Sequence, residues 1–162
     1  MERLWAPWRL DYVAGGESKQ GCVFCLQSRP DAASLLLYEG STCYVILNLY
    51  PYNNGHLMVV PYRHVATLAG LTPAELQEVA LLAQRAETAL TEAYRPHGIN
   101  VGVNLGKAAG AGVLEHLHVH LVPRWDGDTN FMTVVADMRV LPEDPASSAA
   151  RLKPIFARLA QS

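Results

Sequence analysis

The most constraining feature of this sequence is the seven-residue run His116-Leu-His-Val-His-Leu-Val122, in which histidine alternates with an apolar residue. Side chains two residues apart on a β-strand point to the same face of a sheet. We therefore expect a strand that places His116, His118 and His120 on one face. The leucine and valine residues between them then point into a core on the other face.

Three interpretations of this run are open. It holds half of the six histidines in the chain and directly follows a glycine-rich segment, Gly106–Gly112. The run can be a solvated polar face, a strip of zinc ligands, or a catalytic site that uses the change in charge of imidazole near neutral pH. The clustering favours a functional site over a solvated face, because histidine is ordinarily scattered. Metal binding and catalysis are not separated by the run alone.

The rest of the chain predicts strands around one long helix. Two β-like runs, Cys43–Leu47 and Leu57–Val60, are joined by a segment rich in Pro, Asn and Gly, which predicts a hairpin. A capping box, Thr72-Pro-Ala-Glu75, precedes apolar residues at helical spacing from Leu76 to Leu90 and predicts one helix. A further strand is expected at Ile99–Val103. The spacing of four apolar residues predicts a terminal helix: Leu152, Ile155, Phe156 and Leu159.

Composition indicates one globular domain. The 162 residues are 50% hydrophobic and 17% charged, which suits a single core. The formal net charge of -2 gives no general attraction to nucleic acid or to a membrane, so neither is an expected partner. No stretch reaches the roughly 20 apolar residues of a membrane span. The three cysteines are too few for a disulfide framework. We expect a cytoplasmic protein.

The histidine run resembles the histidine triad, or HIT, motif, in which three histidines alternate with apolar residues before two further apolar residues. The opening Leu4–Arg9 and the segment around Trp125 are most similar to bacterial diadenosine polyphosphate hydrolases and phosphorylases. Further segments carry the resemblance over most of residues 21–131: Asn48, Gly55–Pro61, Asn104 and Pro123–Phe131.

The resemblance implies an α+β fold: a mostly antiparallel sheet with one long helix packed on it, extended across a homodimer. The whole chain, residues 1–162, is then a single HIT domain. A tryptophan-containing arm covers residues 1–21, the core covers 22–131, and a tail with a helix covers 132–162.

The resemblance also implies a reaction. His118 matches the family nucleophile, which takes the nucleotide from a dinucleoside polyphosphate such as diadenosine tetraphosphate and passes it to water or to inorganic phosphate. His120 would donate a hydrogen bond to a phosphate oxygen, and His56 would support that strand. No catalytic metal or organic cofactor is required by this scheme.

Nucleotide contacts are implied at a second group of residues. Asn48 resembles the residue that binds the ribose hydroxyls, and Asn104 resembles a polar contact near the leaving group. Backbone N–H groups of Gly110, Ala111 and Gly112 are candidates for phosphate binding, although the glycine-rich segment also fits a plain turn. Many family members have Ser or Thr where this chain has Ala111 and Gly112, so backbone donors would have to replace a side-chain contact to the phosphate or leaving group.

Two other functions fit the same motif. One is a nucleoside phosphoramidate hydrolase like the smaller HIT proteins, and the other is a non-catalytic nucleotide-binding or adaptor protein. The presence of His118, His120 and His56 together argues against pure binding, because binding alone needs no nucleophile beside a donor.

A zinc site is implied as well. The pair Cys22-Val-Phe-Cys25 alone fits a redox motif, half of a zinc site or chance. Zinc-binding members of the superfamily add a histidine after the Gly-His strand and the first triad histidine, which here are His64 and His116. The four would close a tetrahedral structural zinc site and leave His118 to act as nucleophile. The alternative is two thiols packed as small apolar groups.

Overall fold

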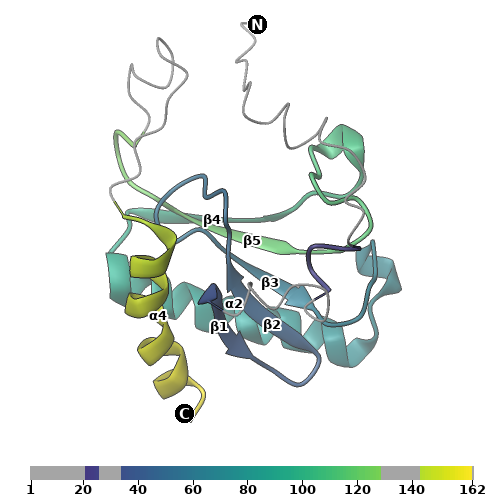
Figure 1. The fold of residues 1–162 in the computed structure, drawn as a ribbon, viewed down its shortest axis with the longest axis horizontal. Helices are drawn as coiled ribbons and strands as arrows, with labels where there is room; N and C mark the ends of the chain where they lie inside the picture. The colour runs from purple at the N-terminus through teal and green to yellow at the C-terminus, as the bar shows by residue number, and fades with distance from the viewer. Residues whose placement is uncertain (1–20, 26–33, 129–142, 162) are drawn as a thin grey trace, which may run out of the picture.

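A computed structural model describes residues 21–25, 34–128 and 143–161 of the chain. They form one antiparallel sheet of five strands in the order β1-β2-β3-β5-β4, with two α-helices (Figure 1). The α+β expectation is confirmed. The strands and helices are β1 Leu36–Glu39, β2 Cys43–Leu47, β3 Leu57–Pro61, α2 Pro73–Tyr94, β4 Gly98–Val103, β5 Val119–Arg124 and α4 Pro145–Leu159.

Parts of the predicted organisation lie outside the described residues. These are residues 1–20 of the arm, residues 26–33 and 129–131 of the core, and residues 132–142 and 162 of the tail. Within the described ranges, no helix is long and apolar enough to cross a membrane.

The predicted hairpin is confirmed. β2 and β3 pair in register from Cys43 opposite Pro61 to Leu47 opposite Leu57, and both strands are buried throughout. β1, which pairs with β2, was not predicted. Its sequence Leu-Leu-Tyr-Glu has no polar alternation, and an edge strand of four residues is too short to show a period.

The long helix begins as predicted. The Thr72 side chain accepts from the Glu75 N–H at 3.2 Å, and the Glu75 carboxylate accepts from the Thr72 N–H at 2.7 Å. The apolar stripe begins one turn later than predicted, at Val79, since Leu76 is 50% exposed. The core-facing residues of α2 are Val79, Leu82, Ala86, Ala89 and Leu90.

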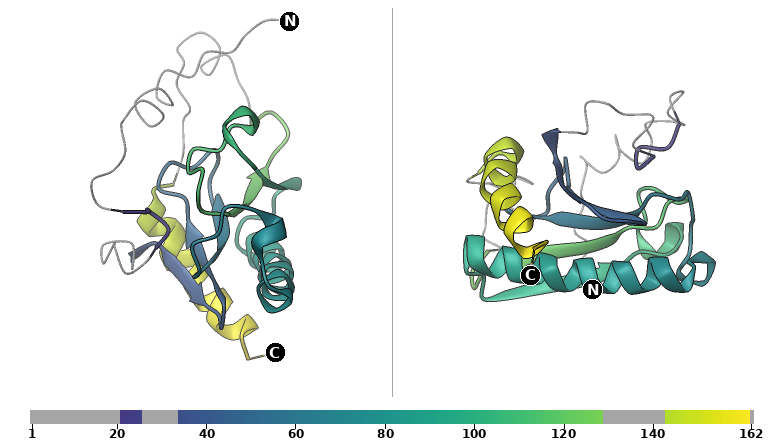
Figure 2. Two further views of the ribbon diagram at one scale, coloured as in Figure 1. Left: turned by 90° about the vertical axis from the view of Figure 1, so that its right-hand side faces the viewer. Right: turned by 90° about the horizontal axis from the view of Figure 1, so that it is seen from below.

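Both helices cover the same face of the sheet. α2 contacts β2, β3 and β5, while α4 packs on α2 and β1. Figure 2 shows α2 running along the sheet with α4 beside one of its ends. Side chains of β2, β3 and β5 at alternate positions, such as Val45, Val59 and Leu121, join the core under these helices. The opposite face carries a smaller apolar cluster that includes Phe24 and Tyr44.

The histidine strand begins later than predicted. β5 starts at Val119, not at His116, because Pro61 of the neighbouring β3 has no N–H with which to continue the ladder. The Leu117 N–H donates instead to the carbonyl of Val65 at 2.7 Å. The predicted alternation holds: Leu117, Val119 and Leu121 are buried, and His120 lies opposite Met58 on the face away from the helices.

Candidate active site and metal centre

His118 lies at the entry to β5 and is only 6% exposed. Its Nδ1 is 2.8 Å from the carbonyl oxygen of His116. A carbonyl can only accept, so the ring hydrogen is on Nδ1 and the lone pair is on Nε2. Burial lowers the pKa of His118, against the opposing effect of that hydrogen bond. The ring is therefore neutral near pH 7, with a nucleophilic Nε2.

A chain of hydrogen bonds determines which ring nitrogens of His56 and His120 carry hydrogen. The Tyr52 N–H donates to His56 Nδ1 at 3.0 Å, so His56 carries its hydrogen on Nε2. That Nε2 is 3.0 Å from His120 Nδ1, which must accept. His120 then carries its own hydrogen on Nε2 and can donate from that atom. Burial, then the neighbouring His120 and His118, lower the pKa of His56 to about 3, which keeps it neutral.

The rings of His118 and His120 are adjacent. The rings of His118 and His120 are 4.7 Å apart in an edge-to-face arrangement, and the ring of Tyr52 is 4.6 Å from that of His56. This pairs an unprotonated imidazole nitrogen with an imidazole N–H on one sheet face. Such a pair can attack an electrophilic centre and stabilise the negative charge that develops beside it.

The two predicted asparagine contacts follow strands that lie on either side of β5 in the sheet. Asn48 follows β2, and its amide nitrogen is 3.3 Å from His56 Nδ1 while its oxygen accepts from the Tyr50 N–H at 2.9 Å. Asn104 follows β4 and donates to the carbonyl of Gly110 at 3.5 Å. Their roles toward a nucleotide stay predictions.

The glycine-rich loop uses part of its backbone internally. The Gly110 N–H donates to the Lys107 carbonyl at 3.0 Å, and the Ala111 N–H donates to the Gly106 carbonyl at 3.3 Å. Gly110 has φ of 85°, in the left-handed region that favours glycine. Two of the three predicted phosphate donors therefore have partners within the loop, and phosphate binding by Gly110, Ala111 and Gly112 stays a prediction.

The four predicted zinc ligands come together. Their donor atoms all lie within 4.8 Å of one another: Cys22, Cys25, His64 and His116. His116 is the triad histidine whose Nδ1 faces the two thiols. It is 1% exposed.

Donor chemistry and geometry fit zinc. Tetrahedral Zn–S and Zn–N bonds place sulfur and nitrogen about 3.6 Å apart. Here Cys22 Sγ and Cys25 Sγ are 3.3 Å and 3.7 Å from His116 Nδ1, and Cys25 Sγ is 3.5 Å from His64 Nδ1. His116 Nε2 is 2.8 Å from the Pro61 carbonyl, so it carries the ring hydrogen and leaves Nδ1 unprotonated, as a metal ligand requires.

Two contributors to the site were not predicted. The Tyr52 N–H sets the hydrogen position of His56, and a backbone donor leaves no signal in a sequence. Phe24 packs on His118 with ring centroids 4.6 Å apart. An aromatic residue between two predicted ligands was the available signal for it.

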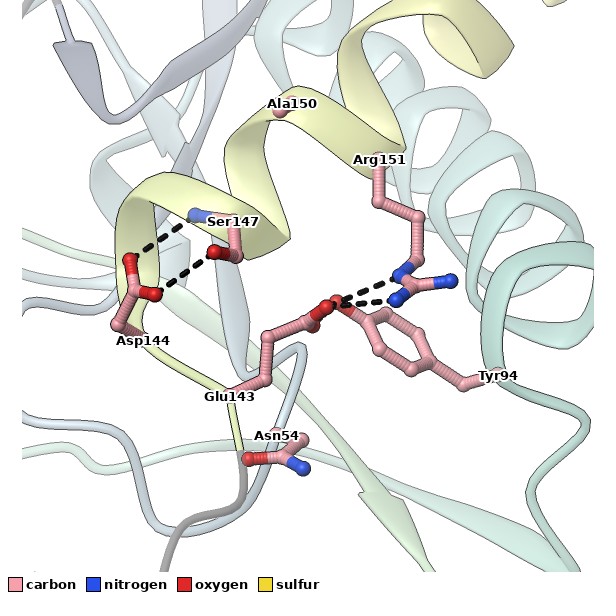
Figure 3. A pocket seen from close by; sticks show the side chains of 7 residues that line it. All are labelled: Asn54, Tyr94, Glu143, Asp144, Ser147, Ala150 and Arg151. Atoms are coloured by element: carbon pink, nitrogen blue, oxygen red, sulfur yellow. Dashed lines mark hydrogen bonds and ion pairs between the residues drawn. The ribbon is translucent and has the colours of Figure 1, made fainter.

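An open hollow of about 700 Å³ lies at the start of α4 (Figure 3). Its charged groups pair with one another, since Glu143 accepts from the Tyr94 hydroxyl at 2.6 Å and from Arg151 at 2.7 Å. None of the histidines is among its described lining residues, which are Asn54, Tyr94, Glu143, Asp144, Ser147, Ala150 and Arg151.

Sequence comparison finds two matches that bear on this site. A family model described as the HIT domain matches residues 29–127. A protein named AP-4-A phosphorylase from Mycobacterium tuberculosis is 43% identical over 152 residues, covering 88% of this chain and 78% of that protein.

Solved structures show the same fold. A zinc-bound histidine triad family protein from Mycobacterium smegmatis is 32% identical, with a TM-score of 0.69 over 87% of this chain and 96% of that chain. Diadenosine triphosphate hydrolase from Plasmodium falciparum covers 94% of this chain and 95% of its own with a TM-score of 0.65. At 13% identity, this second likeness bears on the fold alone.

Proposed function

This chain belongs to the HIT domain family, and on that premise we propose that it cleaves dinucleoside polyphosphates, such as diadenosine tetraphosphate, through a nucleotidyl-His118 intermediate. The observation that carries the proposal is the 2.8 Å contact from His118 Nδ1 to the His116 carbonyl, which leaves the lone pair on Nε2. The similarity to AP-4-A phosphorylase supports the choice of substrate.

The first step transfers the nucleotide. His118 Nε2 attacks the α-phosphorus, so a P–N bond forms while the P–O bond to the departing polyphosphate breaks. The ring then carries positive charge, which the His116 carbonyl stabilises by accepting from Nδ1. His120 Nε2–H donates to a nonbridging oxygen, and its orientation follows from the 3.0 Å contact with His56.

The second step releases the nucleotide. An acceptor oxygen attacks the same phosphorus, the P–N bond breaks, and its electron pair returns to Nε2. Water would give AMP and ATP from diadenosine tetraphosphate, and inorganic phosphate would give ADP and ATP. The name of the 43% identical relative favours phosphate as the acceptor.

Nucleotide contacts complete the proposal. Asn48 would bind the ribose hydroxyls next to the α-phosphate, and its contact with His56 supports this role. Asn104 and the Gly110–Gly112 segment lie before the histidines in the chain and would contact the phosphates or the leaving group. The Gly112 N–H is the preferred backbone donor of the loop, because those of Gly110 and Ala111 have partners within it.

Structural zinc is the proposed resident metal. Cys22, Cys25, His64 and His116 would hold it, and it would supply a rigid cross-link between the chain before β1 and the entry to β5. The zinc-bound relative from Mycobacterium smegmatis supports this assignment. Cys22, Cys25 and Cys43 are free thiols, which suit a reducing compartment, and we propose the cytoplasm.

A homodimer joined through β4 is also proposed. β4 is the last strand of the described sheet and pairs there with β5 alone. Its Val101 is 57% exposed, and such an edge is a template for another strand.

Product analysis tests the proposed reaction. The enzyme is incubated with diadenosine tetraphosphate with and without inorganic phosphate, and separately with adenosine phosphoramidate. We expect ADP and ATP that depend on phosphate, whereas AMP and ATP regardless of phosphate would identify a hydrolase. Turnover of the phosphoramidate alone would contradict the proposal. His118→Ala should abolish turnover and keep nucleotide binding, which separates the enzyme from an adaptor protein.

A further inference from the structure

The turn between the two cysteines touches the nucleophile directly. Cys22 and Cys25 close a tight turn through the Cys25 N–H and the Cys22 carbonyl at 3.1 Å, and Phe24 lies at its tip. The Phe24 ring is 8% exposed and lies 4.6 Å from the ring of His118, inclined by 39°. We infer that Phe24 is a positioning residue, which the thiol–imidazole cluster presses against His118 to hold the nucleophile in its reactive orientation.

The contacts form a closed circuit. The cluster binds His116 through Cys22 Sγ at 3.3 Å, and the His116 carbonyl accepts from His118 Nδ1 at 2.8 Å. His118 packs on Phe24, which lies in the chain between the cluster residues Cys22 and Cys25. One set of ligands therefore fixes both the backbone atom that sets the hydrogen position of His118 and the side chain that covers its ring.

Phe24 is also fixed from behind. The Tyr44 hydroxyl, on a buried β2 residue, donates to the Phe24 carbonyl at 2.6 Å. The Phe24 ring also lies 5.7 Å from the ring of His116 in an edge-to-face arrangement. The Phe24 ring therefore contacts both a member of the thiol–imidazole cluster and His118.

The contact with Phe24 restricts rotation of the His118 ring. Without Phe24 beside it, that ring has space to rotate, and rotation breaks the hydrogen bond that keeps the lone pair on Nε2. The loss falls on the chemical step, because the attack needs Nε2 aligned with phosphorus. This inference rests on the proposed function for its kinetics, while the state of the His118 ring is measured independently of turnover.

The test compares Phe24→Ala, Phe24→Leu and the control Val23→Ala, which removes apolar volume from the same turn. Long-range proton–nitrogen spectra of the imidazoles report which ring nitrogen of His118 carries hydrogen. In the zinc-loaded wild type we expect the Nδ1–H form alone. Phe24→Ala should give a mixture of both forms and lower kcat on the order of 10-fold to 100-fold, with KM within about 2-fold.

Phe24→Leu, which keeps most of the volume, should restore the Nδ1–H form and most of kcat, and Val23→Ala should match wild type. Removing zinc with a chelator should give the same mixed His118 signal as Phe24→Ala. A Phe24→Ala protein with a pure Nδ1–H form would overturn the inference, as would a raised KM with unchanged kcat. If wild type fails to cleave the dinucleotide, the proposed function fails, and the spectra still decide the role of Phe24.

Discussion

At the scale of single residues, the site depends on where hydrogens sit on three imidazoles. The histidine motif predicted which residues take part, and the structure brings His56, His118 and His120 together. The motif did not predict which ring nitrogens carry hydrogen, because this depends on the His116 carbonyl and the Tyr52 N–H, which are backbone groups. The family and the enzyme class predicted from the sequence are confirmed.

His56 gives a prediction for stability against pH. Its pKa is about 3 in the folded chain and near 6.5 in the unfolded chain, so the unfolded chain binds more protons between these values. Stability from neutral His56 is complete above pH 6.5 and is lost as pH falls, by about 2 kcal/mol at pH 5. His56→Gln, which does not titrate, should show a smaller loss between pH 7.5 and pH 5 in urea unfolding. Equal losses in both proteins would contradict the assignment.

At the scale of elements, the sequence predicted those parts of the fold that carry strong local signals. Thr72 and Glu75 marked the start of α2, and alternation or turn residues marked β2, β3 and β4. β1 was missed because four residues show no period. The first residue of β5 was predicted wrongly because it depends on Pro61 in the neighbouring strand β3. That is a tertiary effect, which a local sequence pattern does not show.

Glu75 tests the anchoring of α2. Its side chain is 7% exposed and binds Arg63 at 2.6 Å and the Thr72 N–H at 2.7 Å, which lower the pKa of Glu75 to about 2. Glu75→Gln should lower the free energy of unfolding at pH 7 by about 1–3 kcal/mol and leave kcat unchanged. The difference from wild type should shrink as pH falls from 4.5 toward 2, because the Glu75 carboxyl of the unfolded chain takes up a proton there while the folded one stays ionised. A difference that grows on acidification would argue against this pairing.

At the scale of the whole molecule, the cluster that includes Cys22 and His116 ties the chain before β1 to the entry of β5. Zinc binding to the folded chain alone would stabilise it. Treatment with a chelator should remove zinc and lower Tm by several degrees, and added zinc should restore both values. Cys25→Ser should bind zinc more weakly, whereas Cys43→Ser, which lies outside the cluster, should keep the metal. An unaltered Tm after complete zinc removal would rule out a structural role.

The β4 edge determines assembly in the proposed dimer. Val101→Lys places a charge on an exposed residue of this edge strand and should shift the protein from dimer to monomer in light scattering. Leu81→Lys on α2 is the matched exposed control. A wild-type monomer, or an unaltered Val101→Lys dimer, would contradict the assembly.

The stereochemical course at the α-phosphorus tests the nucleotidyl-His118 intermediate most directly. It is followed with a dinucleoside polyphosphate made chiral at that phosphorus by sulfur and oxygen isotopes. Transfer through nucleotidyl-His118 involves two in-line displacements, each of which inverts the phosphorus. A nucleotidyl-His118 intermediate therefore predicts net retention of configuration. Net inversion would show a single displacement by the acceptor and would contradict a covalent intermediate on His118.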